Sequence, residues 1–293
     1  MNQKKSNYSN LMKSYNVVYP ILIYFLVMTL AMNIFAMLIV GMGADYQKQY
    51  MLLQTAVSLV TIPFIYRYYK KDKNQPTVFH QHLNETLQQK SKNQKIVNGI
   101  LMFLAGAAMG IALNNLIALT TLKEISKAFQ EANENFFGGG VLFEILGACL
   151  ITPLLEEMLY RSVVYGRICD LMIPKAVAET EEQQKRYKKN RMLAILFTSL
   201  IFGVMHMNLV QFIYALILGF MLSWFVEESG HLYGAVAAHV GANLMAVLRL
   251  ETGMFRWMTK GEGIFIGATA GFLLIGAVLF VVIWKYNTKA KQE

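Results

Sequence analysis

The run VVYPILIYFLVMTLAMNIFAMLIVG, from Val17 to Gly41, is apolar throughout and holds no charged residue. A helix needs about 20 residues to cross the hydrocarbon core of a bilayer, so this run is long enough to span one. It is too long for the core of a signal peptide and no convincing cleavage site follows it, so we expect a retained span. Further apolar runs lie at 50–69, 96–122, 141–166, 192–208, 210–227, 232–250 and 264–284.

The composition agrees with a membrane protein. Hydrophobic residues make up 55% of the 293-residue chain and charged residues 15%, whereas soluble domains carry roughly 25% charge. Backbone groups in lipid must bond internally, and runs of this length do so as helices. We therefore predict an all-α, polytopic membrane bundle of about eight transmembrane helices. It forms one membrane domain, divided into N-terminal spans (1–140), a core (141–250), and a final span with a basic tail (251–293).

The net charge of +9 does not indicate a nucleic-acid partner. The basic residues lie between the apolar runs, as in loops that face anionic lipid, and no basic groove with stacking side chains is evident. With both termini inside, Lys and Arg number 20 in the inside segments and 6 in the outside segments. The positive-inside rule then places both termini in the cytoplasm of a cell membrane, which we take to be a bacterial plasma membrane.

The fourth span holds the densest group of ionisable residues, which are costly in lipid and so mark function or a tight pair. Glu157 and Arg161 are four residues apart on one helix face, so we expect them to pair as structural support. Glu156 points about 100° away and has no such partner. A buried carboxylate of this kind accepts a proton readily, which suits a general base.

Two other spans offer polar side chains of matching chemistry. The fifth carries His206, and the seventh carries His239 and Asn243 on one face. Together with Glu156 they supply two bases or ligands and donors for an oxyanion, which are the groups needed to hydrolyse an amide with water. Small residues surround His239, so helices can approach closely there and leave room for a substrate. They are Gly234, Ala235, Ala237, Ala238, Gly241 and Ala242.

Other motifs give weaker evidence of function. His80 and His82 lie in a basic loop, where we expect a solvated face. The stretch Gly41–Asp45 has one residue too many for the GxGD motif of intramembrane aspartyl proteases, and no second membrane aspartate accompanies it. Neither GxSxG nor HExxH occurs, which argues against typical serine and zinc intramembrane sites.

The ordered set Glu156-Glu157-x-x-x-Arg161, Phe202-x-x-x-His206 and His239-x-x-x-Asn243 resembles the CPBP family. These are the CAAX proteases and bacteriocin-processing enzymes, also called the Abi family. The resemblance covers residues 150–250 with motif support. It implies an intramembrane endopeptidase in which Glu156, helped by His206, activates a water while His239 and Asn243 stabilise the oxyanion. The implied substrate is a peptide or protein, membrane-associated or lipidated; in bacteria the implied roles are peptide or bacteriocin maturation, or immunity.

The resemblance leaves the cofactor open. Glu156, His206 and His239 could hold Zn²⁺ with water as the fourth ligand, or the same residues could act without metal, and we favour the metal-free alternative. Counted along its helix, Glu156 lies about 22 Å from the outer end of the fourth span. Similar counting places His206 too near the outside, unless its helix begins earlier, within the charged stretch before Met192. We expect that earlier start, and a hydrated cavity open to the cytoplasm.

Two other functions fit the same residues. Buried Glu and His side chains could relay protons in a coupled transporter, although no discontinuous, repeated halves are evident. The chain could also be a catalytically idle scaffold, against which the retained Glu156, His206, His239 and Asn243 argue. The sequence leaves these as alternatives to a protease.

Overall fold

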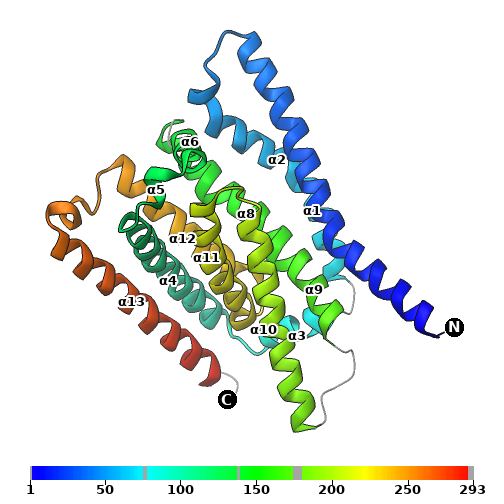
Figure 1. The fold of residues 1–293 in the computed structure, drawn as a ribbon. Coiled ribbons are helices and arrows are strands. Elements are labelled where there is room, and N and C mark those ends of the chain that lie inside the picture. Colours follow the sequence, from blue (N-terminus) through cyan, green and yellow to red (C-terminus); the bar gives the residue numbers. More distant parts are fainter. Residues whose placement is uncertain (1, 75–77, 137–138, 174–179, 290–293) are drawn as a thin grey trace.

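The chain is described by a computed structural model over residues 2–74, 78–136, 139–173 and 180–289. In those ranges the structure is helical and contains no strand, so the predicted all-α polytopic bundle is confirmed (Figure 1). The α-helices are α1 (Asn2–Gly41), α2 (Tyr46–Lys73), α3 (Val78–Gln88), α4 (Lys92–Ala118), α5 (Leu122–Ile125), α6 (Lys127–Phe136), α7 (Val141–Phe143), α8 (Thr152–Glu157), α9 (Tyr165–Met172), α10 (Glu181–Val204), α11 (Leu209–Ser229), α12 (Leu232–Glu251) and α13 (Glu262–Lys289). Two π-helical stretches, Glu144–Ile151 and Met158–Val164, and a 3₁₀ turn, Arg256–Lys260, complete the elements.

The number of spans is lower than the sequence suggested. Six described helices, α1, α2, α4, α11, α12 and α13, are long and apolar enough to cross a membrane, and a seventh counts if α6 and the run Val141–Met172 form one bent span. The predicted run 192–208 does not qualify. Only the second half of α10 is apolar, and 192–204 gives about 20 Å of helix against about 30 Å of hydrocarbon.

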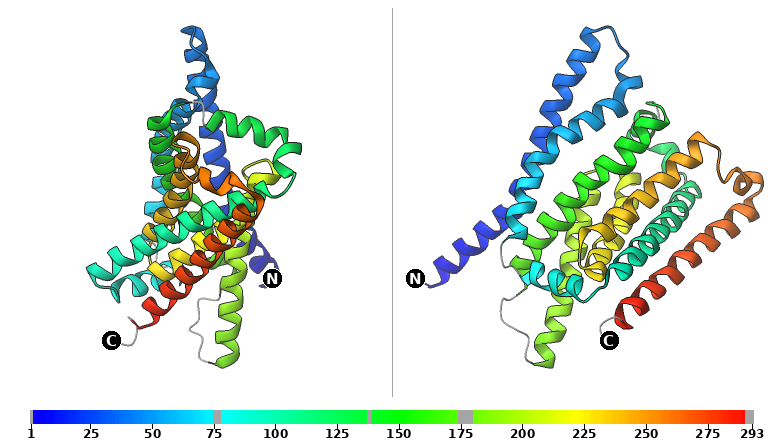
Figure 2. Two further views of the ribbon diagram at one scale, coloured as in Figure 1. Left: turned by 90° about the vertical axis from the view of Figure 1, so that its left-hand side faces the viewer. Right: turned by 180° about the vertical axis from the view of Figure 1, so that it is seen from behind.

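The helix that carries the fifth apolar run does begin earlier, as expected. It starts at Glu181, where the Thr180 hydroxyl accepts from the backbone N–H of Gln183 and the Gln183 side chain accepts from Thr180 N–H. It ends at Val204, and Asn208 then caps α11 through the backbone N–H of Gln211. The charged half of α10 therefore extends beyond the packed bundle, and its far end stops short at the turn 205–208 (Figure 2).

The centre of the bundle is built on close backbone contact between α4 and α12, with α13 on the far side of α4 (Figure 1). A Cβ at Gly106 would lie 1.9 Å from the carbonyl oxygen of Ala238, and one at Gly241 would lie 2.3 Å from that of Phe103. Ala235 and Ala238 are fully buried. The small residues around His239 thus pack helices, and the expectation that they leave room for a substrate is wrong.

Polar contacts identify one end of the bundle as the end that holds both termini. Arg167 in the first turn of α9 pairs with Asp72 at the end of α2 and donates to the carbonyl oxygen of Asn16. Lys90, just before α4, donates to Asn287 near the end of α13 at 2.5 Å. The α1–α2 turn, α5 and α6 lie at the opposite end (Figure 1).

Candidate functional site

The two glutamates lie on a short α-helix between two π-helical stretches. Pro153 stands in the first turn of α8, where its missing N–H is tolerated, and the wider turns on either side change which side chains share a face. π-helical turns often occur at functional sites. Here they frame the segment 152–157, which carries Glu156 and Glu157 at its end.

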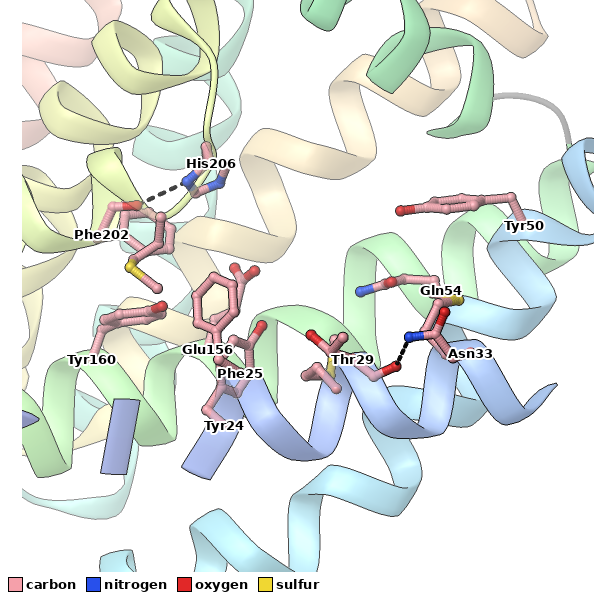
Figure 3. Close-up of a pocket in the computed structure, with 13 residues that line it drawn as sticks. Tyr24, Phe25, Thr29, Asn33, Tyr50, Gln54, Glu156, Tyr160, Phe202 and His206 are labelled. Carbon is pink, nitrogen blue, oxygen red and sulfur yellow. Dashed lines mark hydrogen bonds between the residues drawn. The ribbon is translucent and has the colours of Figure 1, made fainter. Parts of the chain in front are cut away.

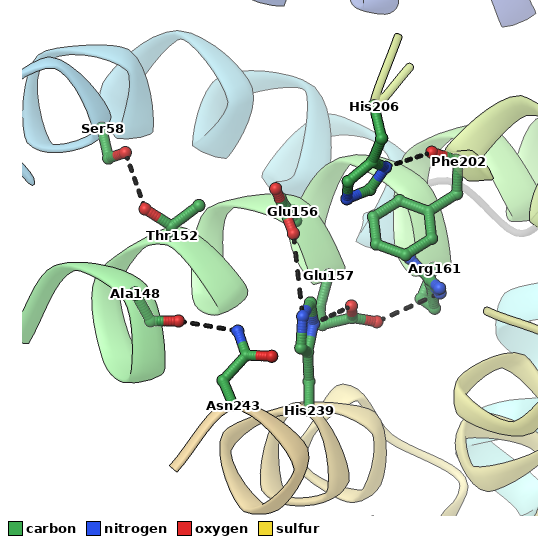
Figure 4. Close-up of polar contacts among 10 residues, drawn as sticks. All are labelled: Ser58, Ala148, Thr152, Glu156, Glu157, Arg161, Phe202, His206, His239 and Asn243. Carbon is green, nitrogen blue, oxygen red and sulfur yellow. Dashed lines mark hydrogen bonds and ion pairs between the residues drawn. The ribbon is translucent and has the colours of Figure 1, made fainter. Parts of the chain in front are cut away.

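Glu157 is the centre of a buried polar chain (Figure 4). One carboxylate oxygen lies 3.2 Å from Nε of Arg161, and the other lies 2.8 Å from Nδ1 of His239. The guanidinium also lies over the ring of Phe202 at 4.0 Å, and Gly219 leaves space for it, since a Cβ there would lie 3.0 Å from Nη2 of Arg161. The predicted pair of Glu157 and Arg161 is therefore present, but Glu157 also orients His239, which the sequence did not indicate.

Glu156 has a different environment. Its side chain is 16% exposed, and its nearest ionic partner is Nε2 of His239 at 3.9 Å, beyond direct hydrogen-bond distance. It lines two adjoining cavities of about 380 and 420 Å³. The carboxylate of Glu156 thus borders cavities that are large enough for water, and its oxygens are available to a water molecule or a substrate.

His206 faces the same cavities from the α10–α11 turn (Figure 3). Its Nδ1 lies 2.8 Å from the carbonyl oxygen of Phe202, four residues earlier in the helix. A carbonyl oxygen only accepts, so Nδ1 carries the hydrogen, and the Nε2 of the neutral ring is an acceptor. The next residue, Met207, has φ of 60°, a left-handed conformation that is costly for a side chain of this size.

Asn243 completes the set. Its side-chain nitrogen donates to the carbonyl oxygen of Ala148 at 2.8 Å, which fixes the amide at the wall of the larger cavity. The four predicted residues Glu156, His206, His239 and Asn243 all line this cavity, whereas Glu157 and Arg161 are buried behind it. Several further polar residues line the cavities and were not predicted from the sequence. Thr152 lies on α8 itself, and the others, on α1, α2 and α11, are Tyr24, Tyr50, Gln54, Gln211 and Tyr214.

The donor set does not favour the zinc alternative. Within the described ranges, no group of three or more His, Cys, Asp or Glu side chains is placed to hold a metal ion. Each histidine keeps Nε2 for a ligand, because its Nδ1 is hydrogen-bonded, as is usual for histidines that bind metals. As the structure places them, Glu156, His206 and His239 are not gathered into a metal site, and zinc binding by these three residues stays a prediction.

Several residues that line the larger cavity lie at the end of the bundle opposite the termini. Tyr50 lies in the first turns of α2, Phe136 ends α6, and Gln211 begins α11. On the other side of Glu156 the buried side chains of Tyr160 and Arg161 fill the interior. The cavity and the termini thus lie at opposite ends of the bundle. The expectation that the termini are cytoplasmic therefore conflicts with the expectation that the cavity opens to the cytoplasm. The depth count gives the position of Glu156 along its helix, and it does not show which side of Glu156 is closed by packing.

A comparison with known protein families finds a match over part of the chain. Residues 138–245 match the family described as type II CAAX prenyl endopeptidase Rce1-like. No curated protein and no solved structure matches the chain. The matched segment contains every residue of the predicted site, from Glu156 to Asn243. It supports a membrane-embedded, CAAX-type protease in general terms, and the apolar helices make the chain a multi-pass membrane protein. Over residues 138–245 the resemblance drawn from the motif order is thus confirmed: this part of the chain is similar to the Rce1-like CAAX endopeptidases.

Proposed function

We propose that the chain is an intramembrane endopeptidase in which Glu156 activates the water that attacks the peptide bond. The observation that carries this proposal is the placement of Glu156, His206, His239 and Asn243 around one cavity. On α8, Glu157 is paired with Arg161 and His239, whereas Glu156 has no ionic partner closer than 3.9 Å and faces open space. A proton relay would need a chain of such groups across the bundle, whereas here the interior beyond Glu156 is filled by Tyr160 and Arg161.

The chemistry follows from which atoms donate and which accept. The carboxylate of Glu156 takes a proton from water, assisted by the acceptor Nε2 of His206, and the hydroxide oxygen bonds to the carbonyl carbon. The amide of Asn243 donates to the oxyanion, and so does Nε2 of His239 when its ring is charged and Nδ1 donates to Glu157. Glu156 then returns the proton to the leaving nitrogen as the carbon–nitrogen bond breaks, giving a carboxylic acid and an amine.

The smaller cavity suggests the character of the substrate. It lies between α1 and the end of α10, and Phe25, Met28 and Met205 give it apolar walls beside Glu156 (Figure 3). An apolar side chain or a lipid group on the peptide fits such a surface. We therefore propose a membrane-associated peptide substrate, CAAX-like in carrying its apolar group next to the bond that is cut, with peptide maturation as the bacterial role.

The test is hydrolysis by the purified full chain in lipid nanodiscs. Membrane-associated peptides, with and without an S-linked isoprenoid, are incubated in H₂¹⁸O and the products are analysed by mass spectrometry. We expect new termini at one position, with one ¹⁸O in the new carboxyl group, and no products from Glu156→Gln. Equal cleavage by wild type and Glu156→Gln would overturn the mechanism, and no cleavage of any peptide by wild type would overturn the function.

A further inference from the structure

Two polar side chains on α2 border both cavities and have no part in the proposed mechanism. Tyr50 and Gln54 line the cavities of about 380 and 420 Å³ together with Glu156 and His206. Both side chains point from α2 into the space beside these two residues (Figure 3). Within the described ranges, no hydrogen bond joins either side chain to another residue. Their polar groups are therefore available to a molecule in the cavities.

Close packing fixes this face of α2 beside α8. The hydroxyl of Ser58, one turn after Gln54, lies 3.1 Å from the hydroxyl of Thr152. A Cβ at Gly147 would lie 2.1 Å from a threonine side chain of α2, so α2 packs directly against the π-helical stretch before α8. Residues four apart share a helix face, so Tyr50, Gln54 and Ser58 form one polar row. Ser58 is buried and bonded, whereas the other two members reach the cavities.

A peptide in these cavities needs hydrogen-bond partners for its main chain. Each residue carries an N–H and a C=O group, and it is costly to leave these unbonded away from water. Much of the wall is apolar, and among its polar side chains Thr152 and Gln211 are already bonded. The amide of Gln54 can both donate and accept, and so can the hydroxyl of Tyr50.

The spacing of these two side chains matches an extended peptide. Four residues of α-helix rise about 6 Å. Two residues of extended chain cover about 6.6 Å, and alternate residues direct their N–H and C=O groups to the same edge. A peptide lying along α2 would thus present main-chain groups at the interval that separates Tyr50 from Gln54.

We propose that Tyr50 and Gln54 form a subsite that binds the main chain of the extended peptide substrate at two residues two positions apart. This rests on the proposed function, because Glu156 marks the bond that is cut. Both residues lie outside the segment 138–245 that matches the family, so the match does not assign them a role. The subsite would hold the peptide across the cavity from Asn243, which lies on α12.

The experiment measures binding without cleavage. The probe is a fluorescent nonapeptide with an S-farnesyl cysteine at its centre, titrated against the full-length Glu156→Gln protein in nanodiscs. Analogues replace one main-chain N–H at a time by an ester oxygen, which removes a donor and weakens the adjoining acceptor. We expect two analogues, modified two positions apart, to bind roughly tenfold more weakly than the parent peptide, as loss of one hydrogen bond to a buried group predicts.

Variants of α2 assign the two sensitive positions. Gln54→Met and Tyr50→Phe keep the size of each side chain and remove its polar group. Each of them, added to Glu156→Gln, should weaken binding of the parent peptide roughly tenfold and make one sensitive analogue bind as the parent does. Gln47→Met, at the exposed start of α2 and outside both cavities, should change neither result.

The outcomes separate this inference from the proposed function. Equal binding of all the analogues, or no binding of the peptide, would overturn the subsite even if the wild type cuts peptides. Unchanged binding by both Gln54→Met and Tyr50→Phe would overturn it as well. Two sensitive analogues that Gln54→Met and Tyr50→Phe assign as expected, beside a wild type that cuts nothing, would support the subsite and refute the protease.

Kinetics of a cleaving protein add a readout that a merely structural role would not give. With Glu156 intact, Gln54→Met should raise KM roughly tenfold and leave kcat nearly unchanged, because the contact is made equally before and during the reaction. A fall in kcat at constant KM would contradict the subsite.

Discussion

The bundle contains two clusters with the same ingredients, a glutamate, an arginine and a histidine, at different levels. In the first, Glu156 lies beside the cavity with His239 at 3.9 Å. In the second, near the end that holds the termini, Glu227 pairs with Arg191, accepts from the hydroxyl of Tyr165, and lies 3.2 Å from Nε2 of His82. The two glutamate side chains are almost equally exposed, 16% and 12%.

The difference lies in the partners. The carboxylate of Glu227 is used by three neighbours, so it has little capacity for a substrate or a water. Glu156 keeps both oxygens available because the neighbouring Glu157 takes the contacts of Arg161 and His239. Glu156 and Glu227 are thus alike in burial and residue type and differ in unfilled bonding capacity beside a cavity, which supports the proposed catalytic role of Glu156.

The largest contrast should come from removing one charge in each cluster. Glu156→Gln should lower turnover by roughly 10³-fold or more, because general-base catalysis contributes about 10²–10⁴-fold, while thermal unfolding changes little. Glu227→Gln should do the reverse, since it weakens three contacts without touching the cavity. Turnover per folded molecule and the melting temperature, measured on both variants in the same detergent, check the contrast. Loss of activity in both without loss of stability in either would contradict it.

The next largest effect concerns the support behind the cavity. Arg161→Met leaves the carboxylate of Glu157 buried with only His239 as partner, which should cost about 3–5 kcal/mol of unfolding free energy. Chemical denaturation of the purified variant measures this, and Arg191→Met provides the matched change in the second cluster. Full stability with activity lost would mean that Arg161 binds substrate and is not structural support.

A smaller effect is expected at the oxyanion. Asn243→Ala removes one donor and should lower kcat by about 10²–10³-fold with KM nearly unchanged, as for other single oxyanion donors. The side chain also bonds the carbonyl of Ala148, so unfolding should be measured alongside. Asn243→Gln, which keeps the amide but displaces it, serves as the matched control. A rise in KM with constant kcat would assign Asn243 to ground-state binding.

Much of this arrangement could be predicted from local sequence. Apolar runs fixed most of the helices, and spacing within one helix predicted the pair of Glu157 and Arg161. The contact between Glu157 and His239 could not be predicted, because it joins residues 82 positions apart on helices whose rotation depends on packing. His80 was expected on a solvated face, yet it is buried, since a loop's composition does not reveal that it folds back as α3.

The position of Tyr50 and Gln54, like the contact between Glu157 and His239, could not be predicted from single motifs. Both residues lie in the second apolar run, and only the fold brings them to one cavity with Glu156. The side on which the cavity opens depends on where α10 stops and what fills the interior below Glu156. Helix counting gives depth along each helix, but it does not show which end is closed.

The last prediction perturbs the protein least and decides its orientation. Cys149 and Cys169 are both buried, and replacing them with alanine gives a background without thiols. A cysteine at Ala132 then reports the larger cavity, and one at the exposed Gln89 reports the end that holds the termini. A membrane-impermeant thiol reagent should label the two from opposite sides, because the structure places them at opposite ends of the bundle.

The basic-residue count then sets the absolute direction. Lys and Arg favour the end with the termini at 20 to 6, so we expect Gln89→Cys to react from the cytoplasm and Ala132→Cys from outside. A peptide would then reach Glu156 from the outer side or from the outer leaflet. Labelling of Ala132→Cys from the cytoplasm alone, with Gln89→Cys outside, would invert the topology and return the site to cytoplasmic substrates. Labelling of both from one side would contradict the arrangement of the helices themselves.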